Sequence, residues 1–304
     1  MNRKITITGG CGFIGSNLVD ALVNQEHDVT VIDDLSSDAH DQFYFNPKAR
    51  YYHYNVVNDH LVNGVFERHE PEYVFHLAAE ARIQNCILDP SRALDINTFG
   101  TQNILAAAKR VKTHRVILSS TSAIYGLSSL PTQKETDAPD CLNAYSYSKL
   151  FSEGLCKMYS DLYDLDTACF RYFNVYGPRQ PKRGSYAPVI GVFSRQKKAN
   201  QLMTIVGDGL QTRDYVHVSD VVAANIAAMN YANKLNAKIM NVGTGTYYSV
   251  LDLAKMMGGE YTHVAPRTGE ARHTCANIQT IKETLNWQPT KSLKDYMENR
   301  EYDT

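Results

Sequence analysis

Tyr145 and Lys149 are the side chains whose spacing best suits acid–base chemistry. They lie four residues apart in a segment with helical spacing, so one face of a helix would carry both. A free phenol titrates near ~10, and a phenolate base at neutral pH needs its pKa lowered by about three units, or roughly 4 kcal/mol. An ammonium about 5 Å away supplies roughly 3 kcal/mol at an effective dielectric constant of about 20. The spacing therefore predicts Tyr145 as a general base beside Lys149, whereas Tyr147 points elsewhere.

Hydroxyl side chains at the end of a strand support this interpretation, because a Tyr–Lys pair by itself is also common on the surface of helices. The apolar segment Val116–Ser119 has the pattern of a buried strand and continues into Ser120 and Thr121. Doubly wound folds place their chemistry at the carboxyl ends of such strands. The sequence therefore puts hydroxyl groups where a reaction is expected.

A glycine-rich segment follows the first strand-like run and opens a helical one. Gly9 allows a tight turn, Gly12 lets a pyrophosphate approach the backbone, and Gly15 lets the helix pack closely on the sheet. The spacing of three and three differs from the usual GxGxxG, and many isolated matches are ordinary turns. The strand before it and the helix after it favour a dinucleotide site.

Asp33 closes the second strand and selects between the two nicotinamide dinucleotides. An acidic side chain there accepts a hydrogen bond from the adenosine ribose and repels a 2′-phosphate, which favours NAD over NADP. The alternative is that Asp33 caps the turn that follows it. A bound NAD would also bring a positive nicotinamide ring, which supplies the rest of the pKa shift that Tyr145 needs.

Short β-branched segments alternate along the chain with longer segments of helical spacing, which predicts parallel βαβ units. The strand-like segments are Ile5–Thr8, Val29–Asp33, Tyr73–Ala78, Val116–Ser119 and Ala168–Val175. The helical segments are Phe13–Val23, Thr98–Arg110, Tyr145–Tyr163 and Val221–Ala232. We therefore expect an α/β fold with a Rossmann-type doubly wound parallel sheet.

A smaller α/β substrate-binding lobe should follow, because the alternation gives way to Gly/Pro-rich loops after about residue 175. Helices are expected near 249–258 and 292–301, while Lys238–Gly243 again has the pattern of a sheet strand. The predicted division is a dinucleotide-binding domain over 1–175, to which 214–245 returns, and a lobe formed by 176–213 and 246–304.

Composition excludes several classes of partner. The 304 residues carry 31 Lys and Arg against 32 Asp and Glu, so no general attraction to nucleic acid or to an anionic membrane is expected. The six cysteines form no CxxC pair and no metal-binding spacing, which predicts reduced, buried thiols and no metal. The chain begins almost directly in a strand and has no apolar run of membrane length, so we expect a cytoplasmic enzyme.

These motifs together resemble the short-chain dehydrogenase/reductase superfamily, in its extended sugar-nucleotide branch. The resemblance is carried by Thr8–Gly15, by Tyr145 with Lys149, and by the segments Phe170–Gln180, Gly207–Val218 and Arg267–Glu270, so it covers nearly the whole chain. Within that branch the sequence looks most like the 4-epimerases of UDP-glucose and UDP-N-acetylglucosamine. A UDP-sugar substrate and bound NAD are what this resemblance implies.

The resemblance also assigns roles by position. It implies Thr121, Tyr145 and Lys149 as catalytic residues. The cofactor residues it implies are Gly9, Gly12, Phe13, Ile14, Gly15, Asp33, Asp34, Asn55, Val56, Leu77, Ala78, Ala79, Asn97, Ser119, Tyr145, Lys149, Tyr172 and Phe173. The substrate residues it implies are Thr121, Ser122, Tyr145, Asn174, Arg213, Arg267, Glu270 and Thr274, with the two arginines on the diphosphate. Surface ion pairs are the alternative for the arginines, and we interpret His76 and His217 as packed polar residues rather than catalysts.

Two departures from related families favour epimerisation by transient oxidation at C4. Dehydratases of the branch have an Asp-Glu pair directly after the catalytic threonine, and UDP-glucuronate decarboxylases have a glutamate two residues after it. Ser122 and Ala123 stand here, so the proton donor and acceptor that elimination needs are missing. Thr274, seven residues after Arg267, replaces the bulky tyrosine of epimerases confined to non-acetylated sugars, which favours UDP-N-acetylglucosamine and UDP-N-acetylgalactosamine.

Two other functions stay open. Lys182 and Arg183 lie in a loop where they could meet a uronic acid, so a UDP-glucuronate 4-epimerase is the nearer alternative, although a solvated basic loop explains them as well. A catalytically silent NAD-sensing regulator is the alternative from another class, but it would be expected to lose Thr121, Tyr145 and Lys149. The family resemblance further implies a homodimer formed through the helices near 98–110 and 145–163.

Overall fold

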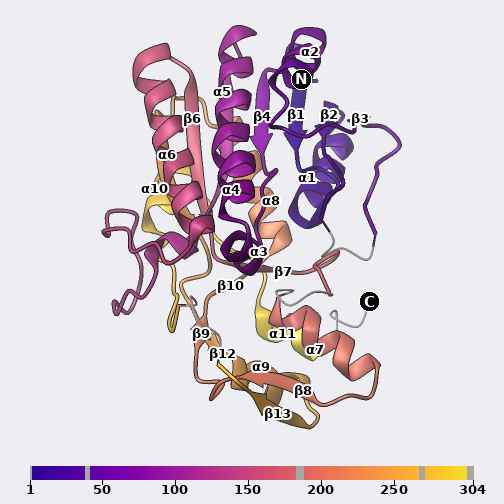
Figure 1. Cartoon of the computed structure of the whole chain (residues 1–304), viewed down its shortest axis with the longest axis vertical. Helices are drawn as coiled ribbons and strands as arrows, with labels where there is room; N and C mark the ends of the chain where they lie inside the picture. Colours follow the sequence, from indigo (N-terminus) through magenta and orange to yellow (C-terminus); the bar gives the residue numbers. More distant parts are fainter. Residues whose placement is uncertain (1, 38–41, 183–187, 267–270, 300–304) are drawn as a thin grey trace.

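A parallel sheet forms the larger part of the molecule (Figure 1). The computed structural model describes residues 2–37, 42–182, 188–266 and 271–299. In spatial order the strands of the main sheet are β11 (Lys238–Val242), β6 (Asp166–Tyr172), β5 (Arg115–Thr121), β4 (Tyr73–His76), β1 (Lys4–Thr8), β2 (Asp28–Ile32) and β3 (Arg50–Tyr52). The chain runs outward from β1 to β3 and then crosses back to β4. This reversal between β1 and β4 is the switch point of a doubly wound sheet and confirms the expected fold class.

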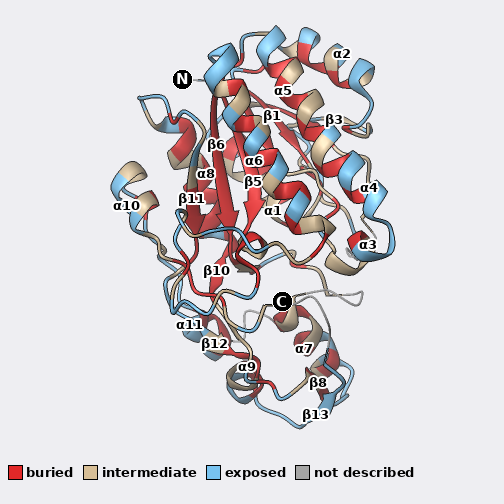
Figure 2. Ribbon diagram, turned by 60° about the vertical axis from the view of Figure 1, so that its left-hand side comes forward, coloured by how far each residue is buried: buried red, intermediate tan, exposed pale blue. Residues whose placement is uncertain are grey.

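Helices cover both faces of the sheet, and the strands between them are buried (Figure 2). One face carries α1 (Phe13–Asn24), α8 (Val218–Asn230) and α10 (Gln279–Leu285), which pack over a cluster that includes Leu18, Val31 and Trp287. The other carries α2 (Asp59–His69), α5 (Gly100–Arg110) and α6 (Ala144–Tyr163), over Phe66, Ile104 and Cys156. Two hydrophobic layers therefore hold the sheet rigidly from both sides.

Further elements form the lobe at the lower end of Figure 1. They are α7 (Val189–Lys198), β8 (Met203–Val206), β9 (Thr212–Arg213), β12 (Tyr248–Ser249), α9 (Val250–Met257), β13 (Tyr261–Val264) and α11 (Leu293–Glu298). A separate cluster that includes Ile190, Phe193 and Leu253 forms its core. Strands β8 and β13 pair in parallel, and β9 and β12 pair antiparallel.

Three local features differ from the sequence expectations. The segment expected as one strand over Ala168–Val175 is two, β6 and β7 (Asn174–Tyr176), because the chain leaves the main sheet at Phe173 and pairs with β10 (Tyr215–His217). A π-helical turn over Asp95–Phe99 precedes α5, after the short helices α3 (Ile83–Leu88) and α4 (Pro90–Leu94).

The third difference concerns α10, which lies inside the range expected for the lobe. It packs against β11 and α8 instead, where Ile281 is fully buried and the Trp287 indole donates to the Asp220 carbonyl. Burial of these apolar side chains against the main sheet draws this part of the chain out of the lobe. We therefore propose a division in which 279–287 belongs with the dinucleotide-binding domain.

The cysteines agree with a further sequence expectation. All six cysteines are free thiols, and five of them are buried, as predicted. Within the described ranges, no helix combines the length and the apolar character that a membrane crossing requires.

Candidate active site

Two cavities meet at the carboxyl ends of the parallel strands. The glycine-loop cavity is lined by Gly9, Gly12, Gly15, Asp33 and Lys149 among others. The lobe cavity lies between the sheet edge and the smaller lobe, and its lining includes Thr121, Asn174, Arg213 and Thr274. Tyr145 and Tyr172 line both, so a group bound in one cavity would meet a group bound in the other at Tyr145.

The glycine loop leaves room for a diphosphate. Gly9 has a φ of +70°, and a Cβ atom there would lie 2.7 Å from the Ala78 amide nitrogen. A Cβ on Gly15 would lie 2.1 Å from the Gly9 carbonyl oxygen, so both positions require glycine. Gly12 stands at the N-terminus of α1 and offers no side-chain cap to the first backbone N–H groups of the helix, and Gly12, Phe13 and Ile14 all line the cavity. Such a helix terminus suits an anion.

Most of the residues expected at the cofactor lie around the glycine-loop cavity. Those that line it are Gly9, Gly12, Phe13, Ile14, Gly15, Asp33, Asp34, Asn55, Val56, Leu77, Ala78, Ala79, Ser119, Tyr145, Lys149 and Tyr172. Phe173 lines the lobe cavity instead, and Asn97 lines neither. Asn97 is fully buried, where it holds the backbone of Glu80 through two hydrogen bonds of 2.8 and 3.0 Å.

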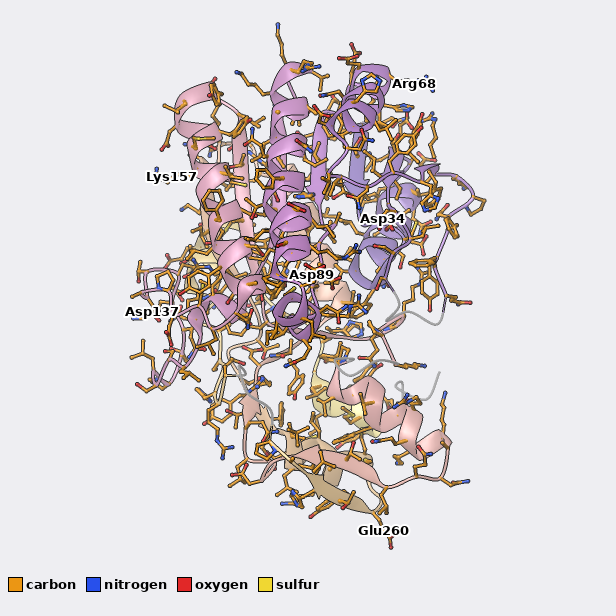
Figure 3. All side chains as sticks on the ribbon, in the orientation of Figure 1. Asp34, Arg68, Asp89, Asp137, Lys157 and Glu260 are labelled. Carbon is orange, nitrogen blue, oxygen red and sulfur yellow. The ribbon has the colours of Figure 1, made fainter. Side chains whose placement is uncertain are left out.

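Asp33 caps a turn and also lines the glycine-loop cavity. Its carboxylate accepts from the backbone N–H groups of Cys11 and Leu35, at 2.9 Å each, so it caps the turn after β2. It also lines the cavity at the place where a ribose would lie if the diphosphate sits on α1. Asp34 follows it (Figure 3) and accepts from the Asn55 amide at 2.7 Å, which fixes the neighbouring loop.

Helix α6 is bound to the end of β5 through three successive strand residues. The Lys149 ammonium donates to the Ser119 carbonyl at 2.8 Å, and Tyr145 shares a hydrogen bond with Thr121. One turn beyond Lys149, the Glu153 carboxylate accepts from the Ser120 hydroxyl at 2.6 Å. Residues 145, 149 and 153 repeat every four positions, so a single helix face supplies all three partners. Tyr147 points away and is 59% exposed, as predicted.

The Glu153 carboxylate is neutralised by Arg171 of β6. The guanidinium donates to both carboxylate oxygens, at 2.9 and 2.7 Å, and lies over the ring of Tyr125. The pair is buried on both sides, which makes this two-point contact strong and costly to break. It fixes α6 beneath the residues that line the cavities.

Burial shifts the ionisation of Tyr145 and Lys149 in opposite directions. It raises the pKa of Tyr145 to about 12, and the hydrogen bond with Thr121 only partly opposes this. It lowers the pKa of Lys149 to about 8. The ammonium would thus lose its proton before the phenol does, so ammonium and phenolate do not coexist in the chain by itself. An additional positive charge is needed to lower the pKa of Tyr145, and a bound nicotinamide ring carries one.

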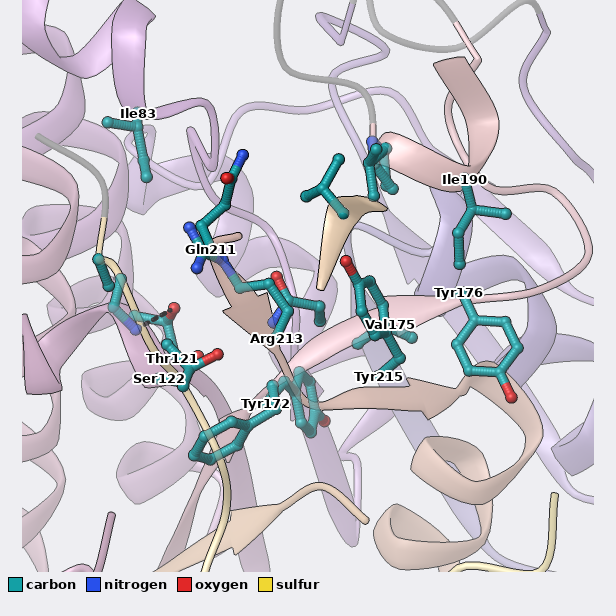
Figure 4. A pocket seen from close by; sticks show the side chains of 18 of the residues that line it. Ile83, Thr121, Ser122, Tyr172, Val175, Tyr176, Ile190, Gln211, Arg213 and Tyr215 are labelled. Atoms are coloured by element: carbon teal, nitrogen blue, oxygen red, sulfur yellow. Dashed lines mark hydrogen bonds between the residues drawn. The ribbon is translucent and has the colours of Figure 1, made fainter. Parts of the chain in front are cut away.

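The lobe cavity brings together residues from distant parts of the chain (Figure 4). Thr121 and Ser122 lie on one side, Tyr215 and Ile190 on the other, and Arg213 between them. The substrate residues expected here that line it are Thr121, Ser122, Tyr145, Asn174, Arg213 and Thr274. Arg267 and Glu270 lie outside the described residues. Around the described part of the lining, Arg213 is the only charged side chain, which suits one anionic group.

Several polar residues of this cavity were missed from the sequence, among them Gln211 and Tyr215. Gln211 and Tyr215 lie within two residues of Arg213 in the same motif, so alternation along a strand would have placed them beside it. The Gln211 side-chain oxygen, the Tyr215 hydroxyl and the Thr274 hydroxyl are buried with no hydrogen-bond partner among the described residues. Buried polar atoms are normally satisfied, so these three are suited to meet a polar ligand.

Both histidines that were set aside as packing residues are structural. His76 is enclosed between the hydroxyls of Thr8 and Thr101, and burial lowers its pKa to about 3. His217 accepts from the Ser219 backbone N–H at the start of α8. Among the described residues, His, Cys, Asp and Glu form no group of three or more that could hold a metal ion.

Comparison with known proteins gives the same family that the geometry suggests. A UDP-glucose 4-epimerase from Thermotoga maritima, solved with UDP-glucose, is 33% identical with a TM-score of 0.92, over 100% of this chain and 98% of that one. A UDP-N-acetylglucosamine 4-epimerase from Methanobrevibacter ruminantium, solved with UDP-N-acetylmuramic acid, is 28% identical with a TM-score of 0.90, over 100% and 97%. A UDP-glucuronic acid 4-epimerase from Bacillus cereus, solved with UDP-glucuronic acid and NAD, is 29% identical with a TM-score of 0.87, over 98% of each chain.

These three relatives act on different sugars, but they share the nucleotide and the fold. The family described as the NAD dependent epimerase/dehydratase family matches residues 5–243, which is most of the chain. The glycine loop, the Tyr145–Lys149 helix and the strand end at Thr121 all lie inside that match. This protein is therefore a member of the NAD-dependent epimerase/dehydratase family, an enzyme whose cofactor is NAD.

Proposed function

We propose that this enzyme is a 4-epimerase of UDP-hexoses that interconverts UDP-N-acetylglucosamine and UDP-N-acetylgalactosamine, and UDP-glucose and UDP-galactose as a second pair. The observation that carries the proposal is the lining of the lobe cavity. Tyr145 and Thr121 border it, but none of its described lining residues is an aspartate or glutamate. Elimination or decarboxylation at this site would need a further acid or base, whereas epimerisation needs only a group that takes and returns one proton.

The residues of this chain suit each proton step. Bound NAD supplies a hydride acceptor for C4 of the sugar and then a hydride donor to the resulting ketone. Tyr145 takes the O4 proton as C4 is oxidised. It returns the proton after the 4-ketopyranose has turned its other face towards the cofactor. Thr121, already hydrogen-bonded to Tyr145, holds O4 and relays the proton. The buried Lys149 keeps a positive charge close to the phenol while its own proton remains bound.

The diphosphate and the sugar would occupy the rest of the lobe cavity. Arg213 supplies a guanidinium for the diphosphate. Thr274 is small and its buried hydroxyl has no hydrogen-bond partner in the described part of the chain, so it leaves both space and a hydrogen-bonding group beside the sugar. Lys182 does not line the described part of this cavity, and Arg183 lies outside the described residues, so UDP-glucuronate serves as a competing substrate in the test.

The apolar residues exposed along α6 and before α5 support a homodimer. Tyr147, Phe151 and Leu162 on α6 are 59%, 59% and 68% exposed, and Leu94 and Phe99 are exposed nearby. Tyr147 and Phe151 are one turn apart, so they continue the same outer stripe. Exposed apolar surface of this kind usually marks a protein contact, and we propose that a second copy of the chain covers it.

The first prediction concerns the reaction. Purified protein, given no added cofactor, should convert UDP-N-acetylglucosamine into its 4-epimer, followed through the anomeric proton NMR signals. Tyr145→Phe should lower kcat by about 10² to 10⁴, because the general base is lost. The matched control is Tyr147→Phe on the same helix, which should keep the wild-type rate. Turnover of UDP-glucuronate alone, or net accumulation of NADH, would show that the enzyme catalyses a different reaction of the family.

A second prediction concerns the pH dependence. Tyr145 acts as a base only when deprotonated, so the rate rises with pH through the pKa that Tyr145 has with NAD bound. Lys149→Met removes a positive charge, raises that pKa and should move the acidic limb of kcat/KM to higher pH by about one to two units. Because Lys149 also lines the glycine-loop cavity, NAD content is measured in each sample. An acidic limb that stays in place in fully loaded Lys149→Met would remove Lys149 from this role.

A third prediction concerns the sugar. Thr274→Tyr should lower kcat/KM for UDP-N-acetylglucosamine by about 10- to 100-fold, because the phenol ring would take the space of the acetyl group. Activity with UDP-glucose should change far less, and Thr274→Ser should keep both activities. Equal losses for both substrates in Thr274→Tyr would show that residue 274 does not select the sugar.

The fourth prediction concerns assembly. Light scattering should give the mass of two 34.2 kDa chains, and Phe151→Glu should give the mass of one, because a charge would be buried in the contact. Leu210→Glu is the matched control, since Leu210 is 57% exposed but lies in the lobe. A single-chain mass for the wild-type protein at micromolar concentration contradicts the proposal.

A further inference from the structure

The loop after β4 places an arginine at the glycine-loop cavity that no sequence motif assigned. Glu80, Ala81 and Arg82 all line this cavity, and Arg82 follows the predicted cofactor residues Leu77–Ala79 along the chain. Among the described lining residues, Arg82 and Lys149 are the only cations. Lys149 donates to the Ser119 carbonyl beside Tyr145, at the end where the reaction takes place. Arg82 is the second cation at this cavity and, although it is paired with Glu80, it is the one we consider for another part of the cofactor.

The charge balance of the glycine-loop cavity indicates which group Arg82 could bind. Asp33, Asp34 and Glu80 contribute three carboxylates to the described lining, against the two cations. NAD would add a diphosphate with two negative charges to a cavity that is already acidic. The N-terminus of α1 offsets part of this charge. A guanidinium at the same cavity would offset more, and its planar fork suits phosphate oxygens.

Glu80 holds Arg82 in place. The Arg82 Nε and Nη2 groups lie 3.2 and 3.3 Å from the two oxygens of the Glu80 carboxylate. Glu80 is itself fixed, because Asn97 bonds to both its backbone N–H and its carbonyl, and Asn97 also donates to Ser148 of α6 at 2.9 Å. The Glu80 side chain is 6% exposed and that of Arg82 21%, so the guanidinium is held at the cavity wall with little freedom. The Asn85 side-chain oxygen, in the amide orientation that its neighbours favour, also accepts from this guanidinium, at 2.7 Å from Nη2. A guanidinium carries five N–H donors, so it can share them between these two residues and a phosphate.

We propose that Arg82 binds the diphosphate of NAD, and that Glu80 is the residue that positions it. The competing explanation is that Arg82 only neutralises the buried Glu80 carboxylate. Arg92 separates the two explanations, because its Nε lies 3.8 Å from the same carboxylate but it does not line the cavity. The proposal concerns the cofactor alone and does not depend on which UDP-sugar the enzyme uses.

The test is the affinity of cofactor-stripped protein for three ligands, measured by titration calorimetry. Arg82→Met should bind NAD and ADP-ribose about 10- to 100-fold more weakly, the loss typical of one hydrogen bond between charged groups. Adenosine, which has no phosphate, should bind as to the wild type. Arg92→Met should keep wild-type affinity for all three ligands. Wild-type affinity of Arg82→Met for NAD, or an equal loss for adenosine, would overturn the proposal.

A double variant distinguishes binding from mere neutralisation. Glu80→Gln with Arg82→Met removes the carboxylate together with the arginine, so no unpaired charge remains at the cavity wall. If Arg82 binds the diphosphate, the double variant still binds NAD at least 10-fold more weakly than the wild type. If Arg82 only neutralises Glu80, the double variant regains wild-type affinity and the proposal is wrong. The same variant carries the test should Arg82→Met alone fail to fold, and circular dichroism establishes folding for each protein.

Discussion

The hydrogen bond from the Lys149 ammonium to the Ser119 carbonyl joins helix α6 to the end of β5, and the geometry of the site depends on this contact. It draws a cation into a place where only 2% of the residue stays exposed. The neighbouring turns of α6 then bring Tyr145 to Thr121 and Glu153 to Ser120. Residues about four apart in a helix lie on the same face, and successive residues at the end of β5 each present one polar group to that face. The three contacts therefore form together.

Burial of this helix face changes the pKa values of Tyr145 and Lys149. Burial favours the neutral forms of Tyr145 and Lys149 over their charged forms, which is why the pKa of Tyr145 rises to about 12 and that of Lys149 falls to about 8. The Glu153 carboxylate does not stabilise the ammonium fully, because Arg171 already neutralises it. Charge on the phenol therefore has to be stabilised from the glycine-loop cavity. In the proposed mechanism, occupancy of that cavity is therefore coupled to the readiness of Tyr145 to take a proton.

Local patterns predicted much of this arrangement, and long-range contacts account for the rest. The spacing of Tyr145 and Lys149, the glycines at 9, 12 and 15, and the alternation of strands and helices are set by neighbours in the chain, so the sequence was enough. The exit from the sheet at Phe173 was not predictable, because it depends on pairing of β7 with β10, about forty residues away. The contact of Asn97 with Glu80, and so the placement of Arg82, depends on the π-helical turn before α5, for which the sequence carries no simple signal.

A buried carboxylate, that of Asp214, connects the segments that meet between the main sheet and the smaller lobe. Asp214, between Arg213 and Tyr215, is fully buried and accepts from the backbone N–H groups of residues 244, 245 and 276, at 2.8, 2.9 and 3.0 Å. Its own carbonyl accepts from the backbone N–H and the amide side chain of Asn174. Desolvation raises the pKa of this carboxyl even though these hydrogen bonds oppose it. Burial of this carboxyl therefore costs free energy, and the carboxyl lies where three segments that line the lobe cavity meet. Because Asn174, Arg213 and Thr274 come from those segments, a substrate held by all three depends on this one carboxylate for its position.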